Sequence, residues 1–281
     1  MPTVDINGHS MYYEVHQPGG NPTGSEGTPA IVMGGWGTFC HGGLGAVPWA
    51  VTQNHTTVVF DYRGIGESTD DLETTPSTQQ YATDVAGLLD HLGWSDVHVV
   101  GMVGMGACIG QELAIARPDL VRSLLMTGTW AKADPIFTDQ LEGFRRAHAE
   151  AGFATFQLLV ASFSFTPEIY NEARDRLIGP DGAWKNLQGR EVAHSRLVEA
   201  CLTHDTVDRL DQITCPTMVV HAGQDVITRP EMTRVLEHGI PNAEGFEWPE
   251  IAHVIAGRDQ RKRFDDLITD FFTRVERAPT T

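Results

Sequence analysis

The chain has 281 residues, enough for one large domain or for a core domain with a smaller insert. Apolar residues make up 41% of it and charged residues 20%, which is typical of a folded globular protein and excludes a disordered chain. Lys and Arg total 20 against 37 for Asp and Glu. The resulting formal charge of −17 disfavours nucleic acids and anionic membrane surfaces as partners.

Segments that would direct the chain to a membrane or out of the cell are not evident. Apolar runs stay well short of the about eighteen residues of a transmembrane helix. Residues 1–5 lack the basic start and apolar stretch of a signal peptide, so we expect a cytoplasmic protein. The cysteines form no CxxC pair, and we expect them to be reduced, without a zinc site or disulfides. They are Cys40, Cys108, Cys201 and Cys215.

Short β-branched runs alternate with helix-like segments along most of the chain. Strands are expected at 11–15, 30–33, 57–60, 97–100, 121–126 and 217–221, with helices at 79–92 and 107–116. This alternation predicts an α/β fold with a mostly parallel, doubly wound sheet. In such sheets ligands bind at the carboxyl ends of the strands, so residues just after each strand are candidates for the site.

The alternation stops between residues 131 and 211, where several helices carry many aromatic side chains. We predict a helical lid at 131–211 over a core formed by 1–130 and 212–281. The aromatic residues either form the core of the insert or make an apolar ceiling for a small-molecule substrate. A lid of this kind can also bury a homodimer interface. Candidate substrate contacts within the lid are Phe137, Phe163 and Trp184.

Five segments of the chain occur in the order seen in the α/β-hydrolase superfamily. They are VMGGWG at 32–37, FDYRGIGES at 60–68, the strand–glycine–helix at 97–117, AGQD at 222–225 and IAH at 251–253. The chain therefore resembles this superfamily over most of its length apart from the insert. Within it, the chain is most similar to single-domain hydrolases of esters, lactones and carbon–carbon bonds. The resemblance implies a catalytic Ser-Asp/Glu-His triad in that chain order, on a hydrolase fold.

Two members of this triad have matching residues. Asp225 follows the strand at 217–221, and His253 lies in the loop before the last helix. In a triad the carboxylate fixes the imidazole tautomer and stabilises the imidazolium, which leaves the other ring nitrogen free as a base. The resemblance therefore implies a catalytic dyad of His253 and Asp225.

The nucleophile of the triad has no match in this sequence. The elbow that carries it needs small residues two positions to either side. Alignment from the strand side places Val103 at the nucleophile position, whereas alignment from the helix side places Gly104 at that position. Neither side chain can attack a carbonyl. Two substitutes stay open: the thiol of Cys108, and the adjacent Cys40 and His41 in a glycine-rich loop.

The oxyanion hole of the superfamily uses backbone N–H groups, which do not depend on the missing serine. By resemblance one donor comes from Gly35 or Trp36, and the other from Met105 or Gly104. Such donors stabilise a developing oxyanion by roughly 3 kcal/mol each. Trp36 is also a candidate for a substrate contact. The histidines show no metal-ligand spacing, so we expect neither a metal nor a cofactor.

The sequence thus predicts an enzyme without a serine nucleophile, in which His253 is a general base. Its substrate would be an apolar carbonyl compound, cleaved by activated water or in a lyase-type step. The resemblance adds cofactor-free oxygenation and decarboxylation as related chemistries. The alternative is a pseudoenzyme that only binds a ligand, because loss of the nucleophile removes the covalent route. Presence of both dyad residues favours catalysis.

Overall fold

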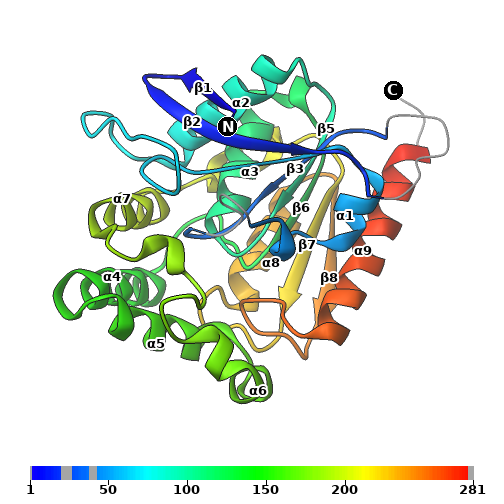
Figure 1. Ribbon diagram of the computed structural model, residues 1–281. Helices are drawn as coiled ribbons and strands as arrows, with labels where there is room; N and C mark the ends of the chain where they lie inside the picture. The colour runs from blue at the N-terminus through cyan, green and yellow to red at the C-terminus, as the bar shows by residue number, and fades with distance from the viewer. Residues whose placement is uncertain (1, 20–26, 38–42, 278–281) are drawn as a thin grey trace.

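The computed structural model describes residues 2–19, 27–37 and 43–277, and these form an eight-stranded sheet flanked by helices (Figure 1). The strand order is β1-β2-β4-β3-β5-β6-β7-β8, in which β1 and β2 are antiparallel and all later pairs are parallel. The predicted α/β class is therefore confirmed. The strands are β1 (Thr3–Ile6), β2 (His9–His16), β3 (Ala30–Met33), β4 (Thr57–Phe60), β5 (Val97–Gly101), β6 (Val121–Thr127), β7 (Thr217–Ala222) and β8 (Ala243–Trp248).

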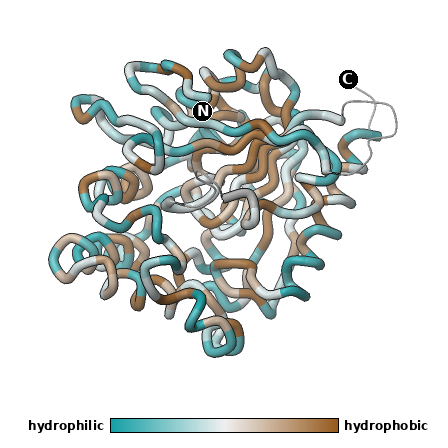
Figure 2. Tube along the Cα trace, in the orientation of Figure 1, coloured by the Kyte–Doolittle hydropathy of each residue, from teal (hydrophilic) through white to brown (hydrophobic). Residues whose placement is uncertain are grey.

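Helices cover both faces of the sheet, which explains why its central strands are apolar at consecutive positions. In β5, for example, Val99 packs towards the face of α2, α3 and α8, and Val100 towards the face of α1 and α9. Figure 2 shows the central strands as the most hydrophobic part of the chain. The helices that cover the sheet are α1 (Trp49–Asn54), α2 (Thr78–Leu92), α3 (Met105–Ala116), α8 (Pro230–Gly239) and α9 (Arg258–Arg277).

The predicted helical insert lies between β6 and β7, and Figure 1 shows it at the carboxyl ends of the strands. Its first helix is capped by the side chain of Asp134, which accepts from the backbone N–H of Phe137 at 2.8 Å. The insert contains α4 (Pro135–Ala151), α5 (Phe153–Ser164), α6 (Pro167–Leu177) and α7 (Glu191–Leu202), with the short 3-10 turn η3 (Lys185–Leu187) before α7. The other 3-10 turns are η1 (Gly43–Ala46), η2 (Pro118–Leu120) and η4 (Val207–Gln212).

Two strands that the sequence did not predict, β1 and β8, are the two edges of the sheet. Edge strands are half-exposed, so they lack the continuous apolar run by which the inner strands are identified. In the described part of the chain, no helix has the length and apolar character needed to cross a bilayer.

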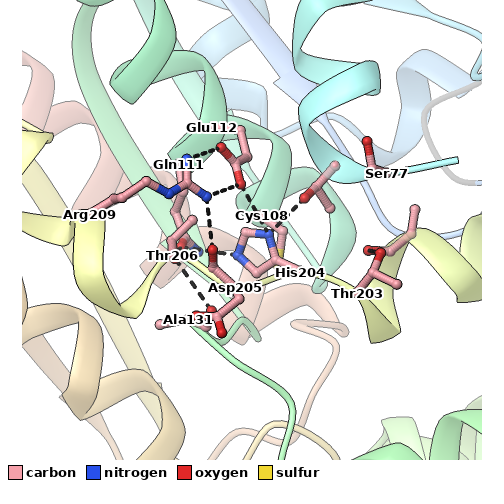
Figure 3. A network of polar contacts seen from close by, with 12 residues as sticks. Ser77, Cys108, Gln111, Glu112, Ala131, Thr203, His204, Asp205, Thr206 and Arg209 are labelled. Atoms are coloured by element: carbon pink, nitrogen blue, oxygen red, sulfur yellow. Dashed lines mark hydrogen bonds and ion pairs between the residues drawn. The ribbon is translucent and has the colours of Figure 1, made fainter. Parts of the chain in front are cut away.

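A buried polar network fastens the end of the insert to α3 (Figure 3). The guanidinium of Arg209 pairs with both carboxylate oxygens of Glu112 at 2.7 Å. Nearby, Nδ1 of His204 accepts from the hydroxyl of Thr78 at 2.8 Å, and its Nε2–H donates to Oε1 of Gln111 at 3.3 Å. With this pairing the neutral imidazole of His204 has both of its ring nitrogens satisfied.

We expect the free energy of unfolding to fall as the pH is lowered below about 6.5. Burial, with Arg209 nearby, lowers the pKa of His204 to about 3, whereas the unfolded chain protonates this group near its ordinary pKa. Its contribution to stability is therefore complete above pH 6.5 and is lost progressively as the pH falls towards 3. At pH 5 the loss amounts to about 2 kcal/mol, at about 1.4 kcal/mol per pKa unit.

Urea unfolding at neutral pH and at pH 5 measures this loss. The drop in unfolding free energy between the two conditions should be smaller in His204→Gln than in the parent. The exposed His238 provides the matched control, since His238→Gln should leave the drop unchanged. An equal drop in His204→Gln and the parent would show that His204 does not hold this linkage.

Candidate active site

A mostly apolar cavity lies between the carboxyl ends of the strands and the helical insert. It has about 420 Å³ of space between its walls, part of it open to solvent. The sheet side of the wall is formed by Gly35, Trp36, Val103, Gly104, Met105, Trp130, Ile227 and His253. The insert contributes Phe137, Leu141, Phe144, Val160, Ser164, Trp184 and Cys201. This position and lining are typical of a small-molecule site in an α/β fold.

The fold brings His253 and Asp225 into contact at this cavity. Nδ1 of His253 lies 2.9 Å from Oδ2 of Asp225, whose side chain is completely buried. Because a buried carboxylate accepts, Nδ1 carries the proton, and Nε2 presents its lone pair. Within the described residues Nε2 has no hydrogen-bond partner, and the ring forms part of the cavity wall. A histidine in this state can accept a proton from a bound molecule.

Asp225 is itself held in place by the turn that follows β7. Its Oδ1 accepts the backbone N–H groups of Ile227 and Thr228, each at 2.8 Å. Its Oδ2 accepts the Thr228 hydroxyl at 2.6 Å. The oxygen of that hydroxyl lies 3.1 Å from Nδ1 of His253, so Thr228 contacts both members of the dyad. These contacts fix the direction of the carboxylate and so of the imidazole.

Glycine is required where the chain passes behind the imidazole. Gly128 follows β6 with φ of 58°, and a Cβ atom built there would lie 3.1 Å from Cε1 of His253. The ring is thus packed directly against backbone, which limits its rotation.

The turn between β5 and α3 has the conformation of a strained strand-to-helix elbow. Val103 adopts φ of 54°, and Gly104 follows with φ of 83° as the N-terminal cap position of α3. A β-branched residue in the left-handed region is an outlier, at a cost on the order of 1–3 kcal/mol. Backbone crowding excludes a Cβ atom at two glycines of this turn: at Gly101 it would lie 2.4 Å from Cα of Ala107, and at Gly106 it would lie 2.2 Å from the carbonyl oxygen of Met33. Gly101 lies two positions before Val103, and Gly106 lies two positions after Gly104, so this crowding fits either alignment, with Val103 or with Gly104 at the apex.

The backbone N–H groups of Trp36 and Met105, both in the cavity wall, are among those that have no hydrogen-bond partner within the described residues. Met105 begins α3, where the first N–H groups of a helix are free of intrahelical bonds. The N–H of Gly104 points instead to the carbonyl of Thr127, at 3.5 Å. Gly35 lies close behind, where a Cβ atom would be 2.6 Å from the carbonyl oxygen of Val103. The candidate oxyanion donors thus lie at the same cavity as His253.

The thiols do not provide a substitute nucleophile. Cys108 is completely buried outside the cavity wall, with Sγ 3.4 Å from Oγ1 of Thr129, and burial raises the pKa of its thiol well above the ordinary value. Cys201 does line the cavity, but burial raises the pKa of its thiol to about 12. Both thiols therefore stay protonated and unreactive at neutral pH. Cys40 and His41 lie outside the described residues.

Of the three lid residues predicted to contact substrate, Phe137 and Trp184 line the cavity. Phe163 does not: its side chain is 38% exposed and packs edge-on against Phe144, which is in the wall. The reason is the rotation of α5, which turns Val160 and Ser164 inward, four residues apart on one helical face. Several wall residues were not among the candidates from the sequence, because apolar patterning does not show which face of a helix or turn meets the cavity: Leu141, Val160, Ser164, Ile227 and Trp130.

The fold brings one further group of possible metal ligands together, at the opposite end of the sheet. The nearest donor atoms of His55, His98 and Glu276 lie within 4.8 Å of one another. His98 lies near the start of β5, and His55 just before β4, so spacing along the chain gave no sign of this group. Burial lowers the pKa of His98, and the nearby charge of Arg122 adds to this and opposes a cation there. The cavity wall itself, in the described residues, has no carboxylate that could bind a metal.

A His–Asp pair facing an apolar cavity at the carboxyl ends of a mostly parallel sheet is the site of a hydrolase-like enzyme. The family model described as "alpha/beta hydrolase fold" matches residues 38–256, and the chain belongs to this family. The resemblance found in the sequence is thereby confirmed at the level of the family and its fold.

Individual relatives are distant over nearly the whole chain. The "Putative carbamate hydrolase RutD" of Azorhizobium caulinodans is 28% identical over 268 residues, 91% of this chain and 92% of that protein. Among solved structures, MGS-M2, an alpha/beta hydrolase enzyme from a Medee basin deep-sea metagenome, has a TM-score of 0.82 at 22% identity, with 97% of each chain covered. The enol-lactonase from Burkholderia xenovorans LB400 has a TM-score of 0.78 at 21% identity, covering 97% of this chain and all of that one. These structures establish the fold, and the names of the relatives indicate a hydrolase.

Proposed function

We propose that this protein hydrolyses an apolar carbonyl compound with His253 as general base, and that it does so without a covalent intermediate. The observation that carries the proposal is the orientation of His253. Asp225 holds its Nδ1 at 2.9 Å, while Nε2 has no partner within the described residues at a cavity whose elbow residues are Val103 and Gly104. A base is thus prepared, and the position beside it has no group that can attack.

In the proposed reaction a water molecule takes the place of the serine. Nε2 of His253 removes a proton from this water as its oxygen attacks the carbonyl carbon. The carbonyl oxygen becomes an oxyanion and accepts the N–H groups of Trp36 and Met105. The tetrahedral intermediate then expels its leaving group, which takes the proton from the imidazolium of His253. Asp225 stabilises that imidazolium throughout.

The lid sets the substrate class in this proposal. The lid spans residues 131–211 in this proposal. It contributes aromatic and aliphatic side chains to the cavity wall, including Phe137 and Trp184. An apolar wall excludes bulk water and strengthens the electrostatic interactions of the dyad. The relatives add two substrate types to test, carbamates and lactones, because their names are those of a carbamate hydrolase and an enol-lactonase.

The test is turnover of a panel of aryl esters, lactones, carbamates, β-diketones and hydroxylated aromatics, with intact-protein mass recorded after rapid quenching. Hydrolysis with no mass adduct supports the proposal. An acylated protein would overturn the non-covalent route. Consumption of oxygen with a hydroxylated aromatic would instead indicate cofactor-free oxygenation, and release of carbon dioxide would indicate decarboxylation. No product at all, with thermal stabilisation by one compound, would favour a ligand-binding pseudoenzyme.

A further inference from the structure

A second groove adjoins the catalytic cavity. Its walls come from α6, from the first turn of α9 and from residues 254–257 between the dyad histidine and that helix. Val103 and Trp184 line both hollows, so the groove begins where the cavity ends. A molecule whose carbonyl lies at His253 can therefore extend into this groove.

The charge of the groove is opposite to that of the protein. Three arginines and one glutamate line it, a formal charge of +2 in a chain with a formal charge of −17. The arginines are Arg176 of α6 and Arg258 and Arg261 of α9. Elsewhere in the described residues, most basic side chains form ion pairs with acidic side chains. In this groove the basic side chains outnumber the acidic ones.

These three guanidinium groups are available to a ligand. Within the described residues Arg176 and Arg258 have no hydrogen bond or ion pair, and all three side chains are exposed. Arg261 makes one long hydrogen bond, 3.4 Å to the carbonyl of Gly45. Burial raises the pKa of the nearby half-buried Asp265, whose Oδ1 accepts the backbone N–H of Ala50, and the charge of Arg261 only partly opposes this rise. Arg209, in contrast, is paired with both carboxylate oxygens of Glu112.

The position of two of these arginines is unfavourable for the helix that carries them. Arg258 begins α9, and Arg261 lies in its first turn. The amino end of a helix already has a partial positive charge, so basic side chains there destabilise the free protein. The same end attracts anions, because its first N–H groups have no intrahelical partner. Helix end and arginines therefore add to one positive field in the groove, which the carboxylates of Asp259 in the same turn and of Glu172 in the groove wall reduce in part.

We propose that this groove binds an anionic group of the substrate, a carboxylate or a phosphate, while the carbonyl lies at His253. The inference rests on the proposed function and narrows it: the substrate is an apolar carbonyl compound with an anionic end. Guanidinium groups bind both anions through paired N–H donors. The positive groove also draws the substrate to the cavity against the negative charge of the rest of the protein.

The first arm of the test compares turnover of a charged ester with that of its neutral counterpart. Ethyl hydrogen adipate and diethyl adipate share the reacting group and differ in one carboxylate. The triple variant Arg176→Gln/Arg258→Gln/Arg261→Gln should lower kcat/KM for the monoester at least tenfold, mainly through KM, and change it less than twofold for the diester. The matched control Arg174→Gln/Lys262→Gln removes two positive charges from the same helices, outside the groove wall, and should change neither.

The second arm needs no turnover and so separates this inference from the proposed function. Calorimetric titrations with hexanoate, hexyl phosphate and 1-hexanol should show tenfold weaker binding of an anion in the triple variant, and unchanged binding of the alcohol. The stronger of the two anions identifies the group. Equal binding of the anions by parent and triple variant would overturn the inference, even where esters are hydrolysed. Weakened anion binding without any hydrolysis would retain the groove and reject the reaction.

Discussion

His253→Ala should lower kcat/KM on any hydrolysed substrate by about a thousandfold. General-base catalysis by a positioned side chain contributes about 10² to 10⁴ in rate, and His253 is the base that the cavity wall offers within the described residues. The neighbouring thiol of Cys201 cannot replace it, because burial raises its pKa to about 12. Residual activity would come from the oxyanion donors and from binding alone.

Steady-state kinetics on the best substrate of the panel measure this loss, with thermal unfolding to confirm that the variant is folded. The exposed His238 is the matched control, and His238→Ala should retain full activity. Turnover of His253→Ala within threefold of the parent would exclude His253 as the base.

Asp225→Asn separates the role of the carboxylate from that of the imidazole, and it should also lower kcat/KM. The amide oxygen can keep the N–H bonds of Ile227 and Thr228, so its NH₂ group replaces Oδ2 beside the histidine. Two donors would then face each other, and the imidazole would move its proton to Nε2, where the base is needed. A loss of similar size to that of His253→Ala, with the fold intact, is expected from this change of tautomer.

The inner sheet could be predicted from local sequence, and the dyad from the resemblance to the superfamily. The central strands are mostly apolar, as in Val97–Val100, where His98 is the exception, and Asp225 and His253 each follow at the place in chain order that the resemblance implies. The contact between the two side chains, 2.9 Å across 28 residues, then follows from the fold. β1 and β8 were missed because edge strands carry a weaker apolar pattern.

Other parts of the site depend on geometry that no spacing encodes. The sequence allowed two registers for the elbow, and the structure gives a positive φ at both candidates for its apex, 54° at Val103 and 83° at Gly104. The packing of the insert decides which face of α5 points inward. For this reason the sequence predicted Phe163 as a substrate contact, whereas Val160 lines the cavity. The arginine groove joins α6 to the start of α9, about eighty residues apart, which patterning along the chain cannot reveal.

Val103→Ser should convert the non-covalent site into one that forms an acyl-enzyme. The elbow already has the strained conformation, and Val103, His253 and the free N–H of Met105 line one cavity. A serine hydroxyl at position 103 would meet Nε2 of His253 as its base and would attack an activated ester. With an aryl acetate we expect a burst of about one phenolate per chain and the acetyl mass on the protein, where the parent gives neither.

Two further variants decide what such a burst means. Val103→Ala removes the same bulk without adding a hydroxyl, so a burst there would come from wider access and not from a nucleophile. Val103→Ser combined with His253→Ala should lose the burst, because the hydroxyl then has no base. Absence of an adduct in the folded Val103→Ser variant would show that the side chain of residue 103 does not face Nε2 of His253. The substrate carbonyl would then not lie beside residue 103, even if His253 is required for turnover.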